Sequence, residues 1–157
     1  MPLSAANRPV ITPAMVLSAL RRIALPRAET IAQPHRRTLV NLETIFHTGV
    51  GPLQRTVTLL GQHVHLSIRP STFRWRYGDG SSATTHTAGA AYPKKTIVHR
   101  YQHAHVTVHP SVRVTWSATY SVNGGPTHTV PGTVTTTGPA TTLRIEEADP
   151  ALSGFGH

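Results

Sequence analysis

The chain has 157 residues and no cysteine, so disulfide bonds, thiolate catalysis and cysteine-based zinc sites are excluded. Fifteen Lys and Arg against six Asp and Glu give a net charge of +9 with histidine neutral, which favours anionic partners in general without selecting one. Thirteen Pro and twelve Gly, with few long helical stretches, indicate an all-β protein with frequent turns.

Residues 1–36 are expected to form a flexible N-terminus, one short helix and a linker. Thr12 followed by Pro13 is typical of an N-cap and first helical residue, and apolar residues then recur at helical spacing over about 14–25. Pro26 ends this pattern. The segment 27–37 is interpreted as a basic linker that contains proline.

Strand patterns begin at Thr38 and predict a β-sandwich over residues 37–147, followed by a C-terminal tail at 148–157. Pro70 is expected to end one alternating strand, and residues 80–93 are expected to form a long loop. The spacing of about ten residues between strands is the signature of a sandwich. The expected strands cover 38–46, a segment that opens at 57, 63–69, 73–77, 112–122, 127–137 and 143–145.

The clearest hairpin joins 112–122 to 127–137 through Asn123-Gly124-Gly125-Pro126. On its first strand Val112, Val114, Trp116, Ala118, Tyr120 and Val122 share one face. Arg113, Thr115, Ser117, Thr119 and Ser121 share the other, so an apolar core face and a polar outer face are predicted.

Two short motifs stand out. Trp75-Arg76-Tyr77 alternates its aromatic residues and stops on Gly78-Asp79-Gly80, which predicts a buried strand running into a tight turn. Glycine permits positive φ, and an Asp side chain accepts hydrogen bonds from backbone N–H groups two or three residues on. The second motif, His99-Arg100-Tyr101, follows about twenty residues later.

The two motifs together resemble the PKD domain (polycystic kidney disease repeat), whose hallmark is W-x-F-G-D-G followed by H-x-Y. Tyr77 replaces the usual Phe, and Gln102-His103-Ala104-His105 replaces the usual Pro-Gly turn. The resemblance covers residues 69–145, and the stretches 38–41 and 138–143 are similar to actinobacterial envelope proteins that contain such a domain.

This resemblance implies an immunoglobulin-like β-sandwich that serves as an extracellular spacer or contacts proteins and polysaccharides. It also implies a structural role for the motif residues Trp75, Tyr77, Gly78, Asp79, Gly80, His99 and Tyr101.

Catalysis is not expected. Asp79 could serve as a calcium ligand or a general base, but no second carboxylate lies near it in sequence, which favours the turn role. The chain has no G-x-S-x-G elbow and no phosphate-binding glycine loop, so neither a catalytic residue nor a cofactor is predicted. The pairs His63/His65 and His103/His105 could chelate zinc or copper given a third ligand, but exposed strand histidines are common, and no metal is predicted.

The binding residues predicted from charge are Arg74, Arg76, Lys94, Lys95 and Arg100. They indicate an interaction module that contacts a partner protein or an acidic polysaccharide, here an acidic glycopolymer. The alternative is a nucleic-acid-binding protein, which the inward phase of Trp75 disfavours. No apolar run is long enough to span a bilayer, although the helix could lie on a membrane surface. We expect an extracellular or envelope location with the export signal missing from this chain, and a cytoplasmic location is the alternative.

Overall fold

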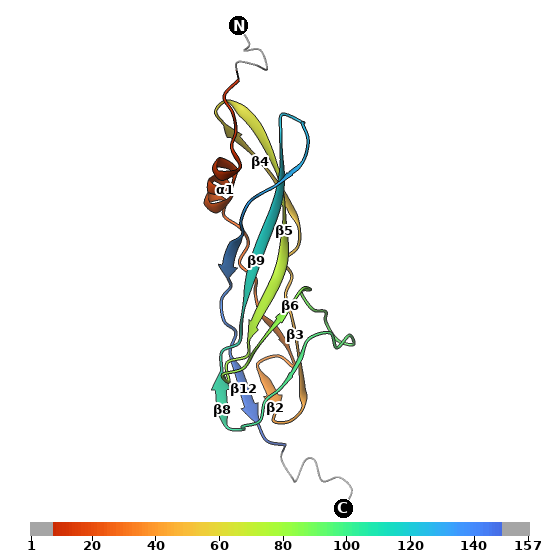
Figure 1. Ribbon diagram of the computed structural model, residues 1–157. Helices are drawn as coiled ribbons and strands as arrows, with labels where there is room; N and C mark the ends of the chain where they lie inside the picture. The colour runs from red at the N-terminus through yellow and green to blue at the C-terminus, as the bar shows by residue number, and fades with distance from the viewer. Residues whose placement is uncertain (1–7, 149–157) are drawn as a thin grey trace, which may run out of the picture. The chain divides into compact units, whose positions relative to one another are not determined.

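The structure, a computed structural model, describes residues 8–148 and is built mainly from strands, with one short helix in that range (Figure 1). The predicted all-β class with a short N-terminal helix is confirmed. Contacts group the chain into two units, each made of three segments: Met1–Leu25, Gly51–Ser71 and Thr115–Thr135 form the first unit, and Pro26–Val50, Thr72–Val114 and Thr136–His157 form the second. The predicted division at 36/37 and 147/148 stays a prediction, and residues 1–7 and 149–157 lie outside the described residues.

Helix α1 (Pro13–Arg22) begins as predicted, because Thr12 is the N-cap and its side chain accepts a hydrogen bond from the N–H of Met15 at 3.3 Å. It ends at Arg22 rather than at residue 25, since Ile23 already has an extended backbone. The helix buries Val16, Ala19 and Leu20. Within residues 8–148, no helix is both long enough and apolar enough to cross a bilayer.

The first unit contains β4 (Leu53–Leu59), β10 (His128–Thr129) and parts of β5 (Gln62–Arg76) and β9 (Ser111–Val122). Leu60 and Gly61 both have positive φ and join β4 to β5 in a two-residue hairpin turn. Asn123 and Gly124 also have positive φ, in agreement with the predicted turn after β9. The strands contribute Val64, Leu66, Ile68, Trp116, Ala118 and Tyr120 to the core of this unit.

Strand β5 runs through Pro70, so the predicted end at this residue is wrong. On one side of β5, β4 pairs as far as Ile68 and β6 (Ser82–Thr85) pairs from Phe73 onward, so Pro70 lies where neither strand pairs with it. Burial falls on even-numbered residues before Pro70 and on odd-numbered residues from Phe73, a shift of one residue that reverses which face is inward. This shift coincides with the boundary between the units.

The second unit holds the remaining short strands: β1 (Ile31–Gln33), β2 (Arg37–Leu39), β3 (Glu43–His47), β6, β7 (Val98–Arg100), β8 (Val106–Val108) and β12 (Leu143–Glu146). Strands β1, β3 and β7 form one sheet in that order, and β2, β12 and β8 form another. The third sheet has the order β10-β9-β5-β4, with β6 paired to β5 and β11 (Val134–Thr137) paired to β9.

Four sequence expectations are corrected here. The expected linker 27–37 contains β1, and the expected loop 80–93 contains β6. The expected strand 38–46 is two strands, β2 and β3, because Asn41 adopts positive φ between them. The expected strand 127–137 is divided into β10 and β11. These short elements depend on pairing with distant strands, which a local pattern does not report.

The core of the second unit lies between β3 and the C-terminal part of β5. The ring of Phe46 contacts Trp75 and Tyr77, with centroids 6.3 and 5.1 Å away. Phe73, Trp75 and Tyr77 are 3%, 1% and 4% exposed, so their predicted inward phase is confirmed.

Candidate functional site

The turn after β5 requires glycine at its first position. Gly78 has φ +89°, and a Cβ there would lie 2.9 Å from the backbone nitrogen of His109 and 2.9 Å from the Cβ of Val108. Gly80 has a similar φ of +90° but open space around it. The N–H of Tyr77 donates to the carbonyl of Ser81 at 3.2 Å and closes the loop.

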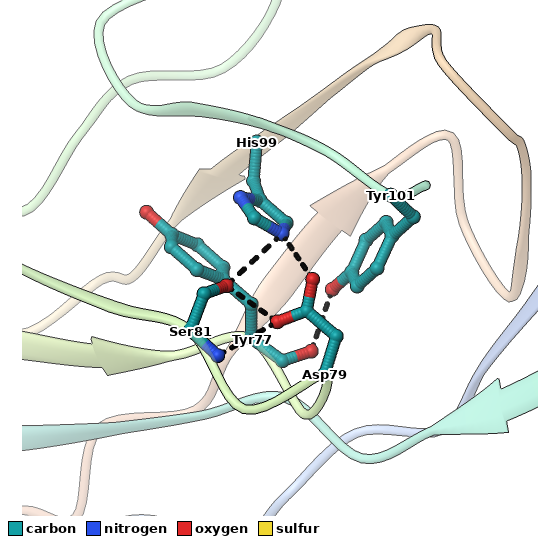
Figure 2. A network of polar contacts seen from close by, with 5 residues as sticks. All are labelled: Tyr77, Asp79, Ser81, His99 and Tyr101. Atoms are coloured by element: carbon teal, nitrogen blue, oxygen red, sulfur yellow. Dashed lines mark hydrogen bonds and ion pairs between the residues drawn. The ribbon is translucent and has the colours of Figure 1, made fainter. Parts of the chain in front are cut away.

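Asp79 is the centre of a polar network shown in Figure 2. Its Oδ1 accepts hydrogen bonds from the backbone N–H of Ser81 at 3.0 Å and from the Ser81 hydroxyl, and its Oδ2 contacts Nε2 of His99 at 2.7 Å. Burial acts to raise the pKa of Asp79, but the hydrogen bonds from Ser81 and His99 outweigh it, so the pKa lies below its ordinary value. The carboxylate therefore stays ionised and fixes the turn.

Aromatic rings enclose this network. The imidazole of His99 stacks on Tyr77 with centroids 4.0 Å apart, and it meets Tyr101 edge-on at 4.7 Å. The Tyr101 hydroxyl donates to the carbonyl of Tyr77 at 2.7 Å (Figure 2). Burial, with a smaller effect of the Asp79 charge, raises the pKa of both tyrosines. Trp75 lies outside this cluster, and its indole N–H donates to the hydroxyl of Thr85 at 3.0 Å.

The geometry of Ser81, His99 and Asp79 differs from that of a catalytic triad. In a triad the histidine uses one ring nitrogen toward serine and the other toward the carboxylate. Here Nε2 of His99 contacts both Asp79 and, at 3.3 Å, the Ser81 hydroxyl, which itself also bonds Asp79. A cavity of about 520 Å³ borders the network and is otherwise lined mainly by residues 102–108.

Four of the five predicted basic residues form two groups of two. Arg74 and Arg76 are exposed on β5, on the opposite side of the strand from Trp75. Strand β6 lies beside them, with Thr84 opposite Arg74 and Ser82 opposite Arg76. An Arg74 N–H donates to the Ser82 hydroxyl at 3.3 Å.

Strand β9 lies on the other side of β5 and adds Arg113, which is exposed because Val112 and Val114 point into the core. We call Arg74, Arg76 and Arg113 the cationic strand face. None of the three forms an ion pair with a carboxylate of residues 8–148. Sequence reasoning placed Arg113 on the outer face of its strand but missed its proximity to β5, because that pairing is non-local.

Lys95 and Arg100 meet instead around Glu43, a residue that the sequence did not single out. The Lys95 ammonium lies 3.1 Å from Oε2 of Glu43, and the Arg100 guanidinium lies 3.1 Å from Oε1. Thr44 and His99 pair on the core side of β3 and β7, so Glu43 and Arg100 point away from the core. The core separates this group from Arg74 and Arg76, and the five predicted binding residues do not form one surface. Lys94 is exposed in the segment before β7.

In each of the two histidine pairs, one member contacts polar or acidic side chains of the protein. Both ring nitrogens of His65 have partners, Nδ1 with Thr56 at 3.2 Å and Nε2 with Gln54 at 2.9 Å. His105 contacts Glu147 at 3.3 Å. In the part of the chain that the structure describes, no three His, Cys, Asp or Glu side chains are grouped to hold a metal.

No family model, curated protein or solved structure matches this chain. The likeness to PKD domains therefore rests on the motif residues of the sequence alone.

Proposed function

We propose that this chain is a non-catalytic, PKD-like β-sandwich module of the extracellular space or cell envelope that binds an acidic glycopolymer. The contact surface in this proposal is the cationic strand face of Arg74, Arg76 and Arg113. Arginine presents N–H donors in a planar fork that matches carboxylate and phosphate groups. Ser82 and Thr84 add hydroxyl groups on the neighbouring strand, which can hydrogen-bond to sugars.

The observation that carries the proposal is that none of these three arginines forms an ion pair with a carboxylate of the described residues. Four carboxylates elsewhere, Glu43, Asp79, Glu146 and Glu147, already have cationic or histidine partners, and the described residues leave only Glu29 outside these ion pairs. Positive charge therefore concentrates on adjacent strands without local neutralisation. Such a surface attracts polyanions, and the attraction weakens as salt is added.

The absence of enzymatic activity in this proposal is supported by the Asp79 network. Its acceptor oxygens are occupied by Ser81 and His99, and the single histidine nitrogen that contacts both groups cannot relay a proton from one to the other. The network is thus suited to holding a turn.

A polymer without bases fits this surface better than nucleic acid. Single-strand binders stack bases on exposed aromatic rings. Trp75, the aromatic residue between the two arginines of β5, is 1% exposed and bonded to Thr85, so it offers no stacking surface.

The test is a titration with polygalacturonate and with a single-stranded oligonucleotide at increasing sodium chloride. The triple variant Arg74→Gln/Arg76→Gln/Arg113→Gln should lose about a hundredfold in affinity for polygalacturonate, since each of the three lost charge-assisted contacts contributes on the order of 1 kcal/mol. The matched control Arg21→Gln/Arg22→Gln/Arg27→Gln removes the same charge from exposed positions elsewhere and should lose much less.

Equal losses in the two triple variants would show that only net charge acts, and the cationic strand face would be rejected. Tighter binding to the oligonucleotide than to polygalacturonate at matched salt would favour the nucleic-acid alternative.

A further inference from the structure

A second cavity, of about 570 Å³, lies on the outer side of the β1-β3-β7 sheet. Its lining includes Leu42, Glu43, Ile45, Tyr92, Lys95 and Arg100. All of these residues belong to the second unit, and none belongs to the Asp79 network or to the cationic strand face. Its volume is in the range of small-molecule sites in proteins, about 300–1,000 Å³.

One side of this cavity is apolar. Leu42 is 52% exposed and Tyr92 is 67% exposed, so both present apolar surface to solvent at the cavity. Ile45 adds a buried apolar residue to the lining, and Pro34 also belongs to it. An exposed apolar surface next to a cavity marks a place where a ligand gains binding energy by displacing water.

The other side carries two cations held together by one anion. Glu43 uses one carboxylate oxygen for Lys95 and the other for Arg100, and its side chain is 31% exposed. The side chains of Lys95 and Arg100 are 55% and 58% exposed, so a ligand arriving from solvent meets the cations more readily than the carboxylate. The group as a whole keeps one net positive charge.

The donors of this group are prepositioned. One Arg100 N–H donates to the carbonyl of Asn41 at 2.8 Å and another to Glu43, which orients the guanidinium and leaves further N–H groups for a ligand. The Lys95 ammonium likewise has more donors than its one ion pair uses. On the apolar side, the backbone N–H of Tyr92 donates to the Gln33 side chain at 2.8 Å, which holds the Tyr92 segment against β1.

We propose that this cavity binds a small amphiphilic anion. One carboxylate, sulfonate or phosphate group contacts Lys95 and Arg100, and a flat apolar body covers Leu42, Ile45 and Tyr92. The net positive charge favours an anion over a cation, and the apolar side favours a ligand that has an apolar body. This site goes beyond the proposed polymer contact, because it lies on the other outer side of the core and uses different residues.

The probes are 8-anilinonaphthalene-1-sulfonate, an apolar anion, and N-phenyl-1-naphthylamine, its uncharged analogue, each titrated by fluorescence against the full chain. Lys95→Gln should raise the Kd of the sulfonate about tenfold, as expected for loss of one charge-assisted hydrogen bond, and leave that of the amine unchanged. Lys94→Gln is the matched control, because Lys94 is exposed, adjacent and outside the cavity lining. It should change the Kd of the sulfonate less than twofold.

A second pair of variants tests the apolar side independently of charge. Leu42→Ser and Tyr92→Ser, both at exposed positions, should weaken both probes several-fold while the melting temperature stays close to that of the parent chain. The triple arginine variant of the cationic strand face should bind the sulfonate like the parent. This result separates the cavity proposal from the polymer proposal, since either can fail alone.

Any one of four results would overturn the inference. The first three are no saturable binding of the sulfonate, equal Kd values for Lys94→Gln and Lys95→Gln, and unchanged binding of both probes after the serine substitutions. Loss of sulfonate binding in the triple arginine variant would also overturn it, because the probe would then occupy the other face.

Discussion

The imidazole of His99 lies flat on the ring of Tyr77, with centroids 4.0 Å apart and planes 2° from parallel. Tyr77 directly follows β5 and His99 belongs to β7, so this stack links the end of β5 to a strand of a different sheet. It also brings Nε2 of His99 to Asp79 at 2.7 Å. A local turn is thereby tied to a strand that lies about twenty residues away in the sequence.

Removing the Asp79 side chain should destabilise the protein. Asp79→Ala leaves the Ser81 N–H and the His99 ring without their acceptor, which costs about 1–3 kcal/mol in the free energy of unfolding, measured by urea titration. Ser81→Ala keeps the carboxylate and the backbone hydrogen bond, so it should cost less. An unchanged free energy of unfolding in Asp79→Ala would contradict the turn-fixing role.

The lowered pKa of Asp79 predicts that part of the stability of the protein is lost in acid. The pKa of Asp79 is lower in the folded chain than its ordinary value, so the unfolded chain takes up the proton first as pH falls. The stabilisation is therefore present above about pH 5 and is lost as pH falls below about 4. Urea titrations at about pH 5 and at about pH 2.5 should show a smaller loss in Asp79→Asn than in the parent. The other carboxylates titrate in both proteins. Equal losses of unfolding free energy in the parent and in Asp79→Asn would therefore show that protonation of Asp79 is not linked to folding.

Gly78 and Gly80 offer a matched pair of substitutions. Both have φ close to +90°, so Gly80→Ala should cost about 1–2 kcal/mol from backbone strain alone. Gly78→Ala should cost a further ~1–3 kcal/mol, because its new methyl group meets the backbone of His109 and the side chain of Val108. Thermal or urea unfolding measures the difference, and equal costs would mean that the close approach at Gly78 relaxes freely.

Two tyrosine-to-phenylalanine substitutions should differ in the same assay. Tyr101→Phe removes the buried donor to the carbonyl of Tyr77 and should cost about 1–3 kcal/mol. Tyr77→Phe keeps the stacked ring and removes a hydroxyl that points away from the network and has no hydrogen bond within residues 8–148. Its free energy of unfolding should therefore stay within about 0.5 kcal/mol of the parent value. If Tyr77→Phe lost more unfolding free energy than Tyr101→Phe, this prediction would be wrong, because the Tyr77 hydroxyl would then be the more stabilising of the two.

Local features followed from the sequence because their causes are local. The N-cap at Thr12, the inward phase of Trp75 and Tyr77, and the positive φ of Gly78 and Gly80 depend on neighbouring residues and on the period of a strand. Pro70 was misleading, because a proline ends a strand only where a partner needs its N–H. Here the partner strand changes from β4 to β6 at that point.

The sequence by itself determined the β class, the core phase of each long strand, the turn chemistry and the excess of positive charge. Only the tertiary structure decided which charges are neighbours: Arg113 joins Arg74 and Arg76, whereas Lys95 and Arg100 converge on Glu43 across the core from them. The physical reason is that alternation assigns each side chain to one face of its own strand, while the choice of neighbouring strand depends on pairing between residues far apart in the chain.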